Sequence, residues 1–328
     1  MKKWREAAAI LLGLVLFTVL TYGAGDLLLP VRTSYGATWD RYLLEEPNSL
    51  DLLYLGSSAV YCDVIPAVVW EETGLTSYVM AGPEQTLPIT YHYLLQACQT
   101  QSPQAVVVEL NALFFPAYPT KSKPNLLYMP WGTQRLQASL FCTAPENRLE
   151  MLFPLYGDHD RVYTVTGEQL EKNLSPQPDP YAGYTLLNKA KPVTKSEERQ
   201  VDTESASYQR DLHYLRKISN FCAQRDIRLV FYFTPTLFQT PQENRDAIYR
   251  DIAAIPHDLF FDCRDGTWPS FDPETGWYDW MHLNIHSAVP FSRRFAAELE
   301  TLALQPLHGN AGLWQGRYDL IMEQAGRA

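Results

Sequence analysis

The chain of 328 residues is acidic, with a formal net charge of -10 and a pI near 5.2. Hydrophobic residues make up 46% of the chain and charged residues 20%, which is typical of a folded globular protein and argues against an extended disordered one. Beyond the N-terminus there is no run of Lys and Arg that could neutralise phosphates. We therefore expect no nucleic-acid partner.

Residues 1–29 have the pattern of a membrane anchor. Lys2, Lys3 and Arg5 precede the apolar stretch "AAAILLGLVLFTVLTYGAG", which carries no charge until Asp26. Its length matches the ~30 Å hydrocarbon core of a bilayer. The basic residues before it predict a cytoplasmic N-terminus and an extracytoplasmic main domain. A cleaved signal peptide is the alternative, but its apolar core is about 7–15 residues long and ends at an A-x-A-like site, which "TYGAGD" does not provide.

The rest of the chain alternates apolar runs with helical patterns. The predicted strands lie at 51–55, 77–80, 105–110, 227–235 and 258–263. The predicted helices lie at 64–74, 88–103, 207–226, 241–255 and 287–304. This order predicts βαβ units, and therefore a three-layer α/β/α fold with a mostly parallel sheet.

We expect this domain over residues 30–305, with an insertion at about 116–201. The tail at 306–328 shows no informative pattern. The insertion is crowded with prolines and aromatic residues and lacks sustained periodicity, but it holds too many large apolar side chains for disorder. It is interpreted either as a hydrophobic cap or as the lining of a sugar-binding groove.

The pattern of cysteines and histidines does not favour a metal site. The five cysteines include no C-x-x-C pair, and their odd number excludes a complete disulfide set. Apolar neighbours indicate that Cys98 and Cys222 are buried free thiols. His282 and His286 are four residues apart, but Leu283 stands where a zinc-protease helix carries its glutamate. We therefore expect no metal and no cofactor.

The sequence "DLLYLGSSAVY" leads the first predicted strand directly into Gly56-Ser57-Ser58. Ligands of open α/β sheets bind beyond the carboxyl ends of the strands, so a serine at this end can reach a ligand. Its hydroxyl needs a base, which a carboxylate would orient. His282 fits as the base, because Asp279 lies three residues before it and can accept its Nδ1 proton. The structural alternatives are a helix N-cap for either serine and a turn residue for Asp279.

Segments 56–58 and 279–282 resemble the first and last blocks of the SGNH/GDSL hydrolase superfamily, with Ser57 in the middle position of the usual G-D-S. The resemblance covers roughly residues 50–115 and 205–305. It extends to a membrane-anchored branch that includes the D-alanyl-lipoteichoic-acid transfer protein and the alginate-type O-acetyltransferases.

The resemblance implies an SGNH/flavodoxin-like fold and acyl transfer through a serine ester. Ser58 would be the nucleophile, His282 the base and Asp279 its orienting partner. Gly82, in "VMAGPEQ", is similar to the glycine block, whose backbone N–H would stabilise an oxyanion together with that of Ser58. Asn111 stands at the place of the asparagine block, although not in a G-x-N-D setting. The residues expected to bind the oxyanion or the substrate are Gly82, Asn111 and Ser57.

From these features we expect an O-acyl or O-acetyl transferase, or an esterase, that acts on a cell-envelope polysaccharide or teichoic-acid-type polymer. The same three side chains serve both directions of the reaction. By analogy with the branch, a multi-pass membrane O-acyltransferase would be the partner that brings acyl groups across the bilayer. The alternative is a non-catalytic SGNH-like binding or scaffold protein in envelope polymer assembly, which would tolerate Ser58→Ala.

Overall fold

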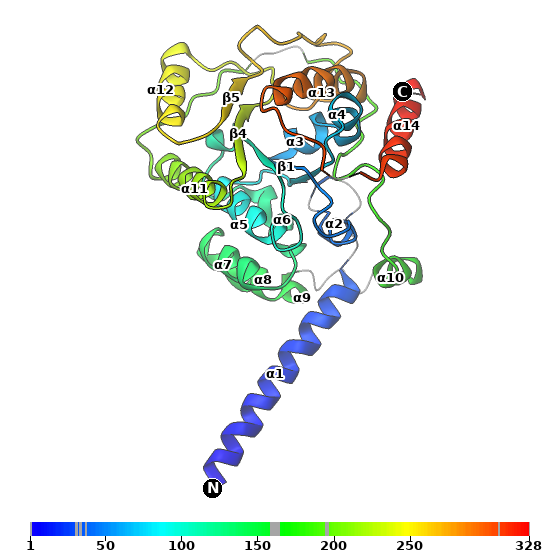
Figure 1. The fold of residues 1–328 in the computed structure, drawn as a ribbon. Helices are drawn as coiled ribbons and strands as arrows, with labels where there is room; N and C mark the ends of the chain where they lie inside the picture. The colour runs from blue at the N-terminus through cyan, green and yellow to red at the C-terminus, as the bar shows by residue number, and fades with distance from the viewer. Residues whose placement is uncertain are drawn as a thin grey trace.

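The computed structural model describes the chain apart from residues 1, 30–31, 33–34, 37, 158–164, 194–196, 308 and 328. In the described residues five strands form one parallel sheet, in the order β2-β1-β3-β4-β5 (Figure 1). They are β1 (Leu52–Gly56), β2 (Ser77–Ala81), β3 (Ala105–Glu109), β4 (Arg228–Phe233) and β5 (Leu259–Asp262). Each strand coincides with a predicted one to within two residues, so the predicted α/β fold with a parallel sheet is confirmed.

The side chains of each strand alternate between two hydrophobic cores, one on each face of the sheet. In β1, Leu53 and Leu55 belong to the first core, whereas Leu52 and Tyr54 belong to the second. Every residue of β1 is buried. Burial on both faces explains why the strands are continuous apolar runs in the sequence and not alternating ones.

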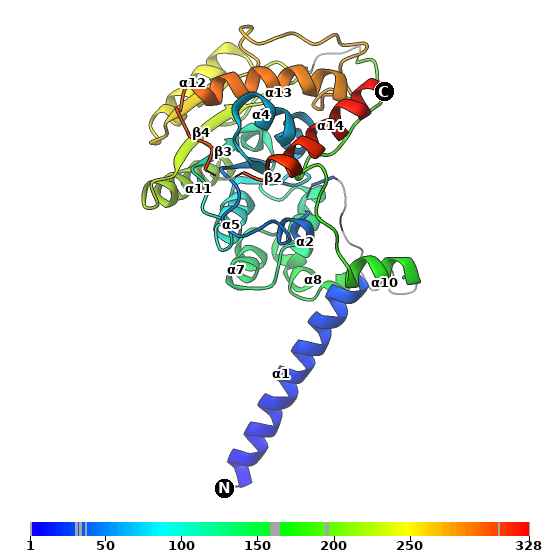
Figure 2. The same cartoon turned by 45° about the vertical axis from the view of Figure 1, so that its right-hand side comes forward.

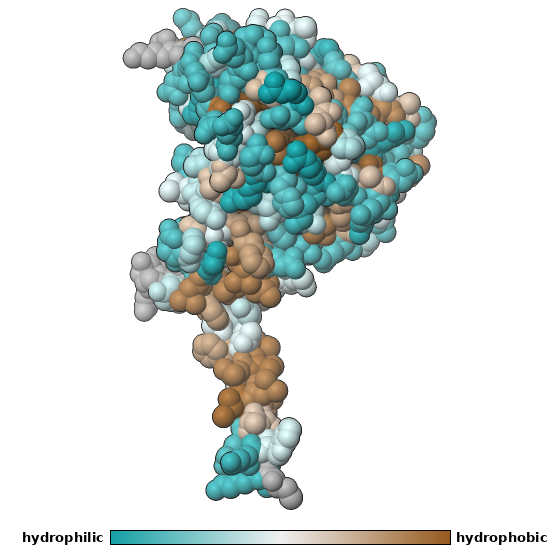
Figure 3. Space-filling view, turned by 90° about the vertical axis from the view of Figure 1, so that its left-hand side faces the viewer, coloured by the Kyte–Doolittle hydropathy of each residue, from teal (hydrophilic) through white to brown (hydrophobic). Residues whose placement is uncertain are grey.

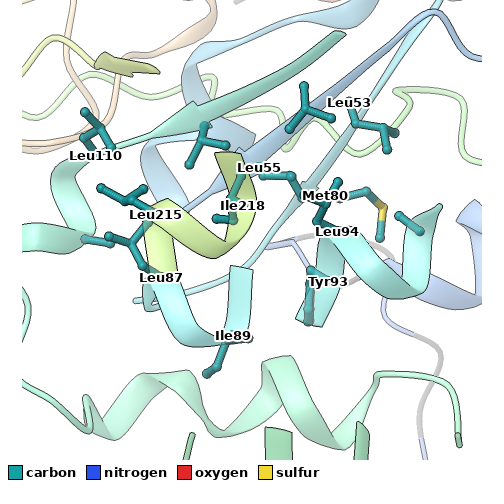
Figure 4. Packing of buried hydrophobic residues seen from close by; sticks show 14 of the residues in the cluster. Leu53, Leu55, Met80, Leu87, Ile89, Tyr93, Leu94, Leu110, Leu215 and Ile218 are labelled. Carbon is teal, nitrogen blue, oxygen red and sulfur yellow. The ribbon is translucent and has the colours of Figure 1, made fainter. Parts of the chain in front are cut away.

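Helices pack on the first face of the sheet over a core of aliphatic and aromatic side chains. They are α2 (Trp39–Tyr42), α5 (Leu87–Ala97), α11 (Ala206–Ala223) and α12 (Gln242–Ala253). Figure 4 shows side chains of α5 and α11 gathered against Leu53, Leu55 and Met80 of the sheet. The apolar residues of α11, Leu215 and Ile218 among them, recur at helical spacing, which is why the sequence predicts this helix.

The second face is covered by helices that include the one beginning at Ser58. They are α3 (Ser58–Asp63), α4 (Pro66–Thr73) and α13 (Ile285–Glu300). Phe295 of α13 packs edge-on against Tyr54 of β1 and Tyr232 of β4, with ring centroids 5.9 and 5.0 Å apart. The start of α3 and the loop before α13, on the same face, meet beyond the carboxyl end of β1, where Ser58 contacts His282.

The C-terminal segment forms a helix, α14 (Ala311–Arg327), which the sequence analysis did not predict. It packs against α4, and the rings of Trp314 and Trp70 stack with centroids 6.4 Å apart. Arg317 forms a buried ion pair with Glu45 at 2.5 Å and lies over the Trp314 ring. Helix α14 is thus fastened to the α/β domain.

Up to Leu174, the described residues of the insertion form a series of short helices, several of which extend the first core, whereas Tyr184 and Leu187 in its later part pack in the second core. The short helices are η1 (Asn111–Phe114), just before the insertion, and then η2 (Thr120–Ser122), α6 (Lys123–Leu127), α7 (Thr133–Phe141), η3 (Pro145–Asn147), α8 (Arg148–Leu152), α9 (Pro154–Gly157) and α10 (Gly167–Leu174). Leu126, Met129, Ala138 and Met151 are buried in the same cluster as α5. Because helices this short carry less than two or three turns of periodic pattern, their positions are not predicted by the sequence.

Helix α1 (Lys2–Leu28) extends away from the domain as a single rod (Figures 1 and 2). Over Lys2–Gly25 it is long and apolar enough to cross a membrane, and its most apolar 18-residue stretch is not buried against the domain. Figure 3 shows its middle as a hydrophobic stalk below the main body. The predicted apolar N-terminal helix is therefore present, with a length compatible with membrane anchoring.

Candidate active site

The chain turns sharply where β1 passes into α3. Gly56, the last residue of β1, has a φ of 153°, and a Cβ at this position would lie 2.6 Å from the Cβ of Glu109 and 2.7 Å from Val60. Only glycine fits here. Ser57 holds the N-cap position of α3 but makes no side-chain capping bond, and Ser58 is the first residue of the helix. Ser58 is therefore not the cap of this helix.

Ser58, His282 and Asp279 form a continuous chain of hydrogen bonds. The Ser58 Oγ lies 2.7 Å from the Nε2 of His282. On the other side of the ring, Nδ1 lies 2.8 Å from both carboxylate oxygens of Asp279. With the Nδ1 proton donated to the carboxylate, Nε2 is left as an acceptor for the serine hydroxyl proton. The three residues come from two segments more than 200 positions apart, which the fold brings together.

Asp279 and His282 lie in a tight loop before α13. The carboxylate of Asp279 also accepts the backbone N–H groups of Met281 at 2.9 Å and His282 at 3.1 Å. Partial burial disfavours its charge, but these N–H groups and the His282 ring outweigh burial and lower the pKa of Asp279 below its ordinary value. The loop is closed by the N–H of Tyr278, which donates to the His282 carbonyl at 2.8 Å. Asp279 is thus both a turn residue and the partner of the imidazole.

A buried acid, Glu109 at the end of β3, lies behind the serine. Its Oε2 accepts the N–H of Ser57 at 3.1 Å, and its Oε1 accepts the N–H of Asn111 at 2.5 Å. Burial raises the pKa of Glu109 to about 7, although these N–H bonds favour its charged form. Glu109 is not among the candidates predicted from the sequence, where its only signal is a lone acid within the apolar run "AVVVEL".

A second buried acid, Asp63 at the end of α3, lies behind the histidine. Its Oδ1 accepts the N–H of Leu283 at 2.9 Å, while its Oδ2 has no hydrogen-bond partner in the described residues. Burial raises the pKa of Asp63 well above the usual range. Glu109 and Asp63 therefore each hold the backbone next to one half of the Ser58–His282 pair. Asp63 is likewise not among the candidates predicted from the sequence.

The donors of two expected oxyanion residues, Gly82 and Asn111, are engaged in other hydrogen bonds. The N–H of Gly82 donates to the carbonyl of Gly56 at 3.2 Å, so it continues the hydrogen bonding of the sheet. The amide of Asn111 donates to Thr234 Oγ1 at 2.5 Å. Gly82 is required instead for close packing, because a Cβ there would lie 2.0 Å from the Oδ1 of Asn125. The expected roles of Gly82 and Asn111 are not supported by these contacts.

The backbone N–H of Ser58 remains a candidate oxyanion donor. The first N–H groups of a helix have no acceptor within the helix, and Ser58 is the first residue of α3. The N–H of Ser57 is bound to Glu109, and its buried hydroxyl has no partner in the described residues. Ser57 thus supports the turn and does not line the cavity beside Ser58.

Ser58 and His282 open into a cavity of about 520 Å³. Its volume is in the range of small-molecule sites. One wall comes from the end of η1 and the start of the insertion, and another from the histidine loop. The aromatic residues that line it are Tyr61, Phe114, Phe115, Tyr118 and Trp280. The insertion therefore contributes to the cavity beside the candidate nucleophile.

Two cationic side chains, Arg199 and Lys121, also line this cavity. The guanidinium of Arg199 lies over the Trp280 ring, 4.0 Å from its centroid, which holds it in place by a cation–π contact. The N–H of Lys121 donates to the carboxylate of Glu84 at 3.0 Å. Glu84 has a positive φ of 45°, and this hydrogen bond joins its loop to the insertion.

The described residues contain no group of three or more His, Cys, Asp and Glu side chains that could hold a metal ion. His286, in the first turn of α13, is exposed. All five cysteines are free thiols; four are buried and Cys98 is half-buried.

The site combines a serine hydroxyl, a histidine with one ring nitrogen held by a carboxylate, and a cavity beside them. No protein-family model matches the chain, and no curated protein matches it in sequence. Chemically, the arrangement can remove a proton from the serine and return it to a leaving group. This is the sequence of proton transfers that acyl transfer requires.

Proposed function

We propose that the protein is a membrane-anchored, extracytoplasmic serine acyltransferase or esterase of the SGNH/GDSL type. The observation that carries the proposal is the 2.7 Å contact between Ser58 Oγ and His282 Nε2, with Asp279 2.8 Å from Nδ1. The layering of the fold supports it: the serine follows β1, and the Asp–His loop precedes α13 on the same face of a parallel sheet.

In the first half-reaction, Ser58 Oγ attacks the acyl carbonyl carbon while His282 Nε2 takes the hydroxyl proton. Asp279 keeps its charge near neutral pH and stabilises the imidazolium that forms. The N–H of Ser58 would donate to the oxyanion of the tetrahedral intermediate. The intermediate collapses as the bond to the leaving oxygen or sulfur breaks, and the leaving group takes the proton from His282. Ser58 then carries the acyl group as an ester.

In the second half-reaction, an acceptor hydroxyl attacks the serine ester while His282 takes the acceptor's proton and then returns it to Ser58 Oγ. If the acceptor is water, the protein is an esterase; if it is a polymer hydroxyl, the protein is a transferase. The cavity favours a sugar-containing acceptor, because the aromatic rings of Tyr118 and Trp280 can pack on the C–H faces of sugars. Arg199 and Lys121 bring positive charge to this cavity, although each also lies 3.9 Å from a carboxylate, that of Glu197 and Glu84 respectively.

The membrane part of the proposal rests on α1. Lys2, Lys3 and Arg5 would stay in the cytoplasm, and the α/β domain would lie outside. The acyl donor would then be supplied on the outer face, as the resemblance implies, by a multi-pass membrane O-acyltransferase. The competing proposal is a binding or scaffold protein with the same fold and an inactive serine.

A fluorophosphonate probe distinguishes these proposals. The full chain in detergent is exposed to the probe and weighed intact, alongside Ser58→Ala, His282→Ala and the control Ser57→Ala. We expect one adduct on the parent chain and on Ser57→Ala, and none on the other two. Ser57→Ala is a matched control because it removes a neighbouring hydroxyl that has no partner in the described residues. An adduct that survives Ser58→Ala would assign the nucleophile elsewhere, and a folded parent chain without any adduct would favour the scaffold.

The direction of the reaction follows from a second measurement. The protein is first treated with an activated ester of labelled acetate, so that Ser58 carries the labelled acetyl group. This acetyl-protein is then incubated with a cell-envelope polymer or with buffer alone. Acetyl recovered on the polymer identifies a transferase, whereas release as free acetate at the same rate in both samples identifies an esterase.

A further inference from the structure

The end of α1 is fastened to the domain by polar contacts with α10. Asn173 donates from Nδ2 to the carbonyls of Leu27 at 2.7 Å and Leu29 at 2.6 Å. Gln169, one helical turn earlier, donates from Nε2 to the carbonyl of Leu28 at 3.2 Å. The last carbonyls of a helix have no donor within the helix, so α10 supplies the donors that α1 lacks. The direction in which α1 leaves the domain is therefore fixed.

A second fastening lies on the opposite side of α1. The hydroxyl of Tyr22 donates to the carbonyl of Leu152 at 2.9 Å. The Tyr22 ring packs on Trp131 with centroids 3.8 Å apart, and it stacks with Phe153 at 6.4 Å. Tyrosine and tryptophan are the residues that favour the interface between lipid and water. Figure 2 shows α8 and α10 on either side of the end of α1.

The length of the apolar segment determines where this junction lies relative to a bilayer. Residues 7–25 carry no charge. At 1.5 Å per residue these residues span roughly 28 Å, which is close to the thickness of the hydrocarbon core. The hydrocarbon core of the bilayer would then end near Asp26, within one helical turn of the backbone carbonyls that α10 binds. The helices that contact residues 22–29 must accordingly lie at the level of the lipid head groups.

Helices α8, α9 and α10, which contact this part of α1, and α7, which packs on α8, expose large apolar side chains. Helices α7, α8, α9 and α10 lie at the end of the domain from which α1 leaves (Figures 1 and 2), and Figure 3 shows a hydrophobic surface at that end, above the stalk. We refer to their exposed apolar residues as the collar: Leu136, Phe141, Leu149, Tyr156 and Leu174. Leu174 of α10 is 71% exposed and Phe141 of α7 is 63% exposed.

We infer that the collar rests in the head-group region of the same bilayer that α1 crosses, so that the domain lies on the membrane surface at a fixed orientation. The inference rests on the membrane insertion of α1, which is part of the proposed function. Lipid is the partner that the structure favours for the collar. The contacts of α1 with α10 and the contacts of Tyr22 hold the collar beside the point where α1 would leave the bilayer. Apolar residues beside such an exit are buried by the lipid that surrounds it.

The test places a single environment-sensitive fluorophore on an introduced cysteine of the full chain. Collar positions are Leu149→Cys and Leu174→Cys. The matched control away from the collar is Leu307→Cys, at a residue 64% exposed, and the control for insertion is Leu16→Cys in the middle of α1. Labelling of the parent chain measures the background from its own cysteines. That background should be low, because four of them are buried and Cys98 is half-buried. Each protein is reconstituted into phosphatidylcholine vesicles and quenched with doxyl-labelled phosphatidylcholine or with aqueous iodide.

We expect labels at 16, 149 and 174 to be quenched several-fold more strongly by the doxyl lipid than the label at 307, which iodide should quench. Equal iodide quenching at 149, 174 and 307, with lipid quenching at 16, would overturn the inference while leaving the anchor intact. Absence of lipid quenching at 16 would refute the anchor itself. Labels at 149 and 174 that are shielded from iodide in native membranes but not in vesicles would assign the collar to a protein partner and overturn lipid as its occupant.

Discussion

Glu109 accepts the backbone N–H of Ser57, the residue directly before the candidate nucleophile, through an oxygen that would also lie 2.9 Å from a Cβ on Gly56. The turn that presents Ser58 is therefore built on a buried carboxyl group. Asp63 likewise accepts the backbone N–H of Leu283, the residue directly after His282. The reactive side chains lie at the surface of a cavity, while the groups that hold their backbone are inside the protein.

We expect Gly56→Ala to destabilise the fold by about 2–4 kcal/mol, because it combines an unfavourable φ with contacts below 3 Å to Glu109 and Val60. The free energy of unfolding in denaturant measures this. Gly266→Ala is the matched control, since Gly266 has a φ of 85° but nothing within 4 Å of its added Cβ. If Gly56→Ala lowered the free energy of unfolding no more than Gly266→Ala does, the close contacts of Gly56 with Glu109 and Val60 would not contribute to stability.

Glu109→Gln should change how stability depends on pH. Burial raises the pKa of Glu109 to about 7 in the folded protein, so ionising it costs folding free energy as pH rises. The parent chain should lose about 3 kcal/mol relative to the variant between roughly pH 4 and pH 8, since each unit of pKa shift is worth about 1.4 kcal/mol. Unfolding curves of both chains across this range measure the difference. A constant difference would mean that Glu109 keeps its ordinary pKa.

Asp279→Asn should leave the fold intact and lower the rate of fluorophosphonate labelling by about 10³–10⁴-fold, because the amide no longer fixes the proton on Nδ1 of His282. The pseudo-first-order labelling rate of the full chain measures this. Asp272→Asn, in another Asx turn of the same region, is the control, because its carboxylate accepts the Glu274 N–H but does not contact His282. An equal loss in the two variants would attribute the effect to the loop and not to the imidazole.

Asp63→Asn and Asp63→Ala should differ. Asparagine keeps an oxygen for the N–H of Leu283 and removes a buried acid, so we expect stability at neutral pH to be equal or higher. Alanine leaves that N–H unpaired and should cost about 1–3 kcal/mol. It should also slow labelling of Ser58, because Leu283 follows His282 directly. Unfolding free energies and labelling rates measured on both variants test this, and identical behaviour would argue against Asp63 as a positioning residue.

The sequence predicts the sheet well because each strand is buried on both faces. Continuous β-branched and aromatic runs such as "AVVVEL" have few other interpretations when helical patterns separate them. The contact between Ser58 and His282 was likewise predictable, since one residue follows the first strand and the other precedes the last helix on the sheet. Its catalytic role stays a prediction.

The remainder depends on contacts that no local pattern encodes. The N–H of Gly82 is bound to Gly56 because the register of β1 and β2 continues one step past the strands. The buried acids Glu109 and Asp63 are defined by partners 50 to more than 200 residues away. Helix α14 is held by packing on α4 and by the Arg317–Glu45 pair, neither of which its own periodicity indicates.

If the domain lies outside the cytoplasm, as proposed, its five free thiols have a consequence for how the chain matures. Burial raises the pKa of Cys98, Cys142 and Cys222 to about 12, so in the folded state almost none of each is the thiolate that attacks disulfides. An exported chain meets oxidants while it is still unfolded, when these thiols are accessible and have their ordinary acidity. Folding of such a chain would therefore have to outpace oxidation, and the thiols of the folded protein would react only slowly with disulfides.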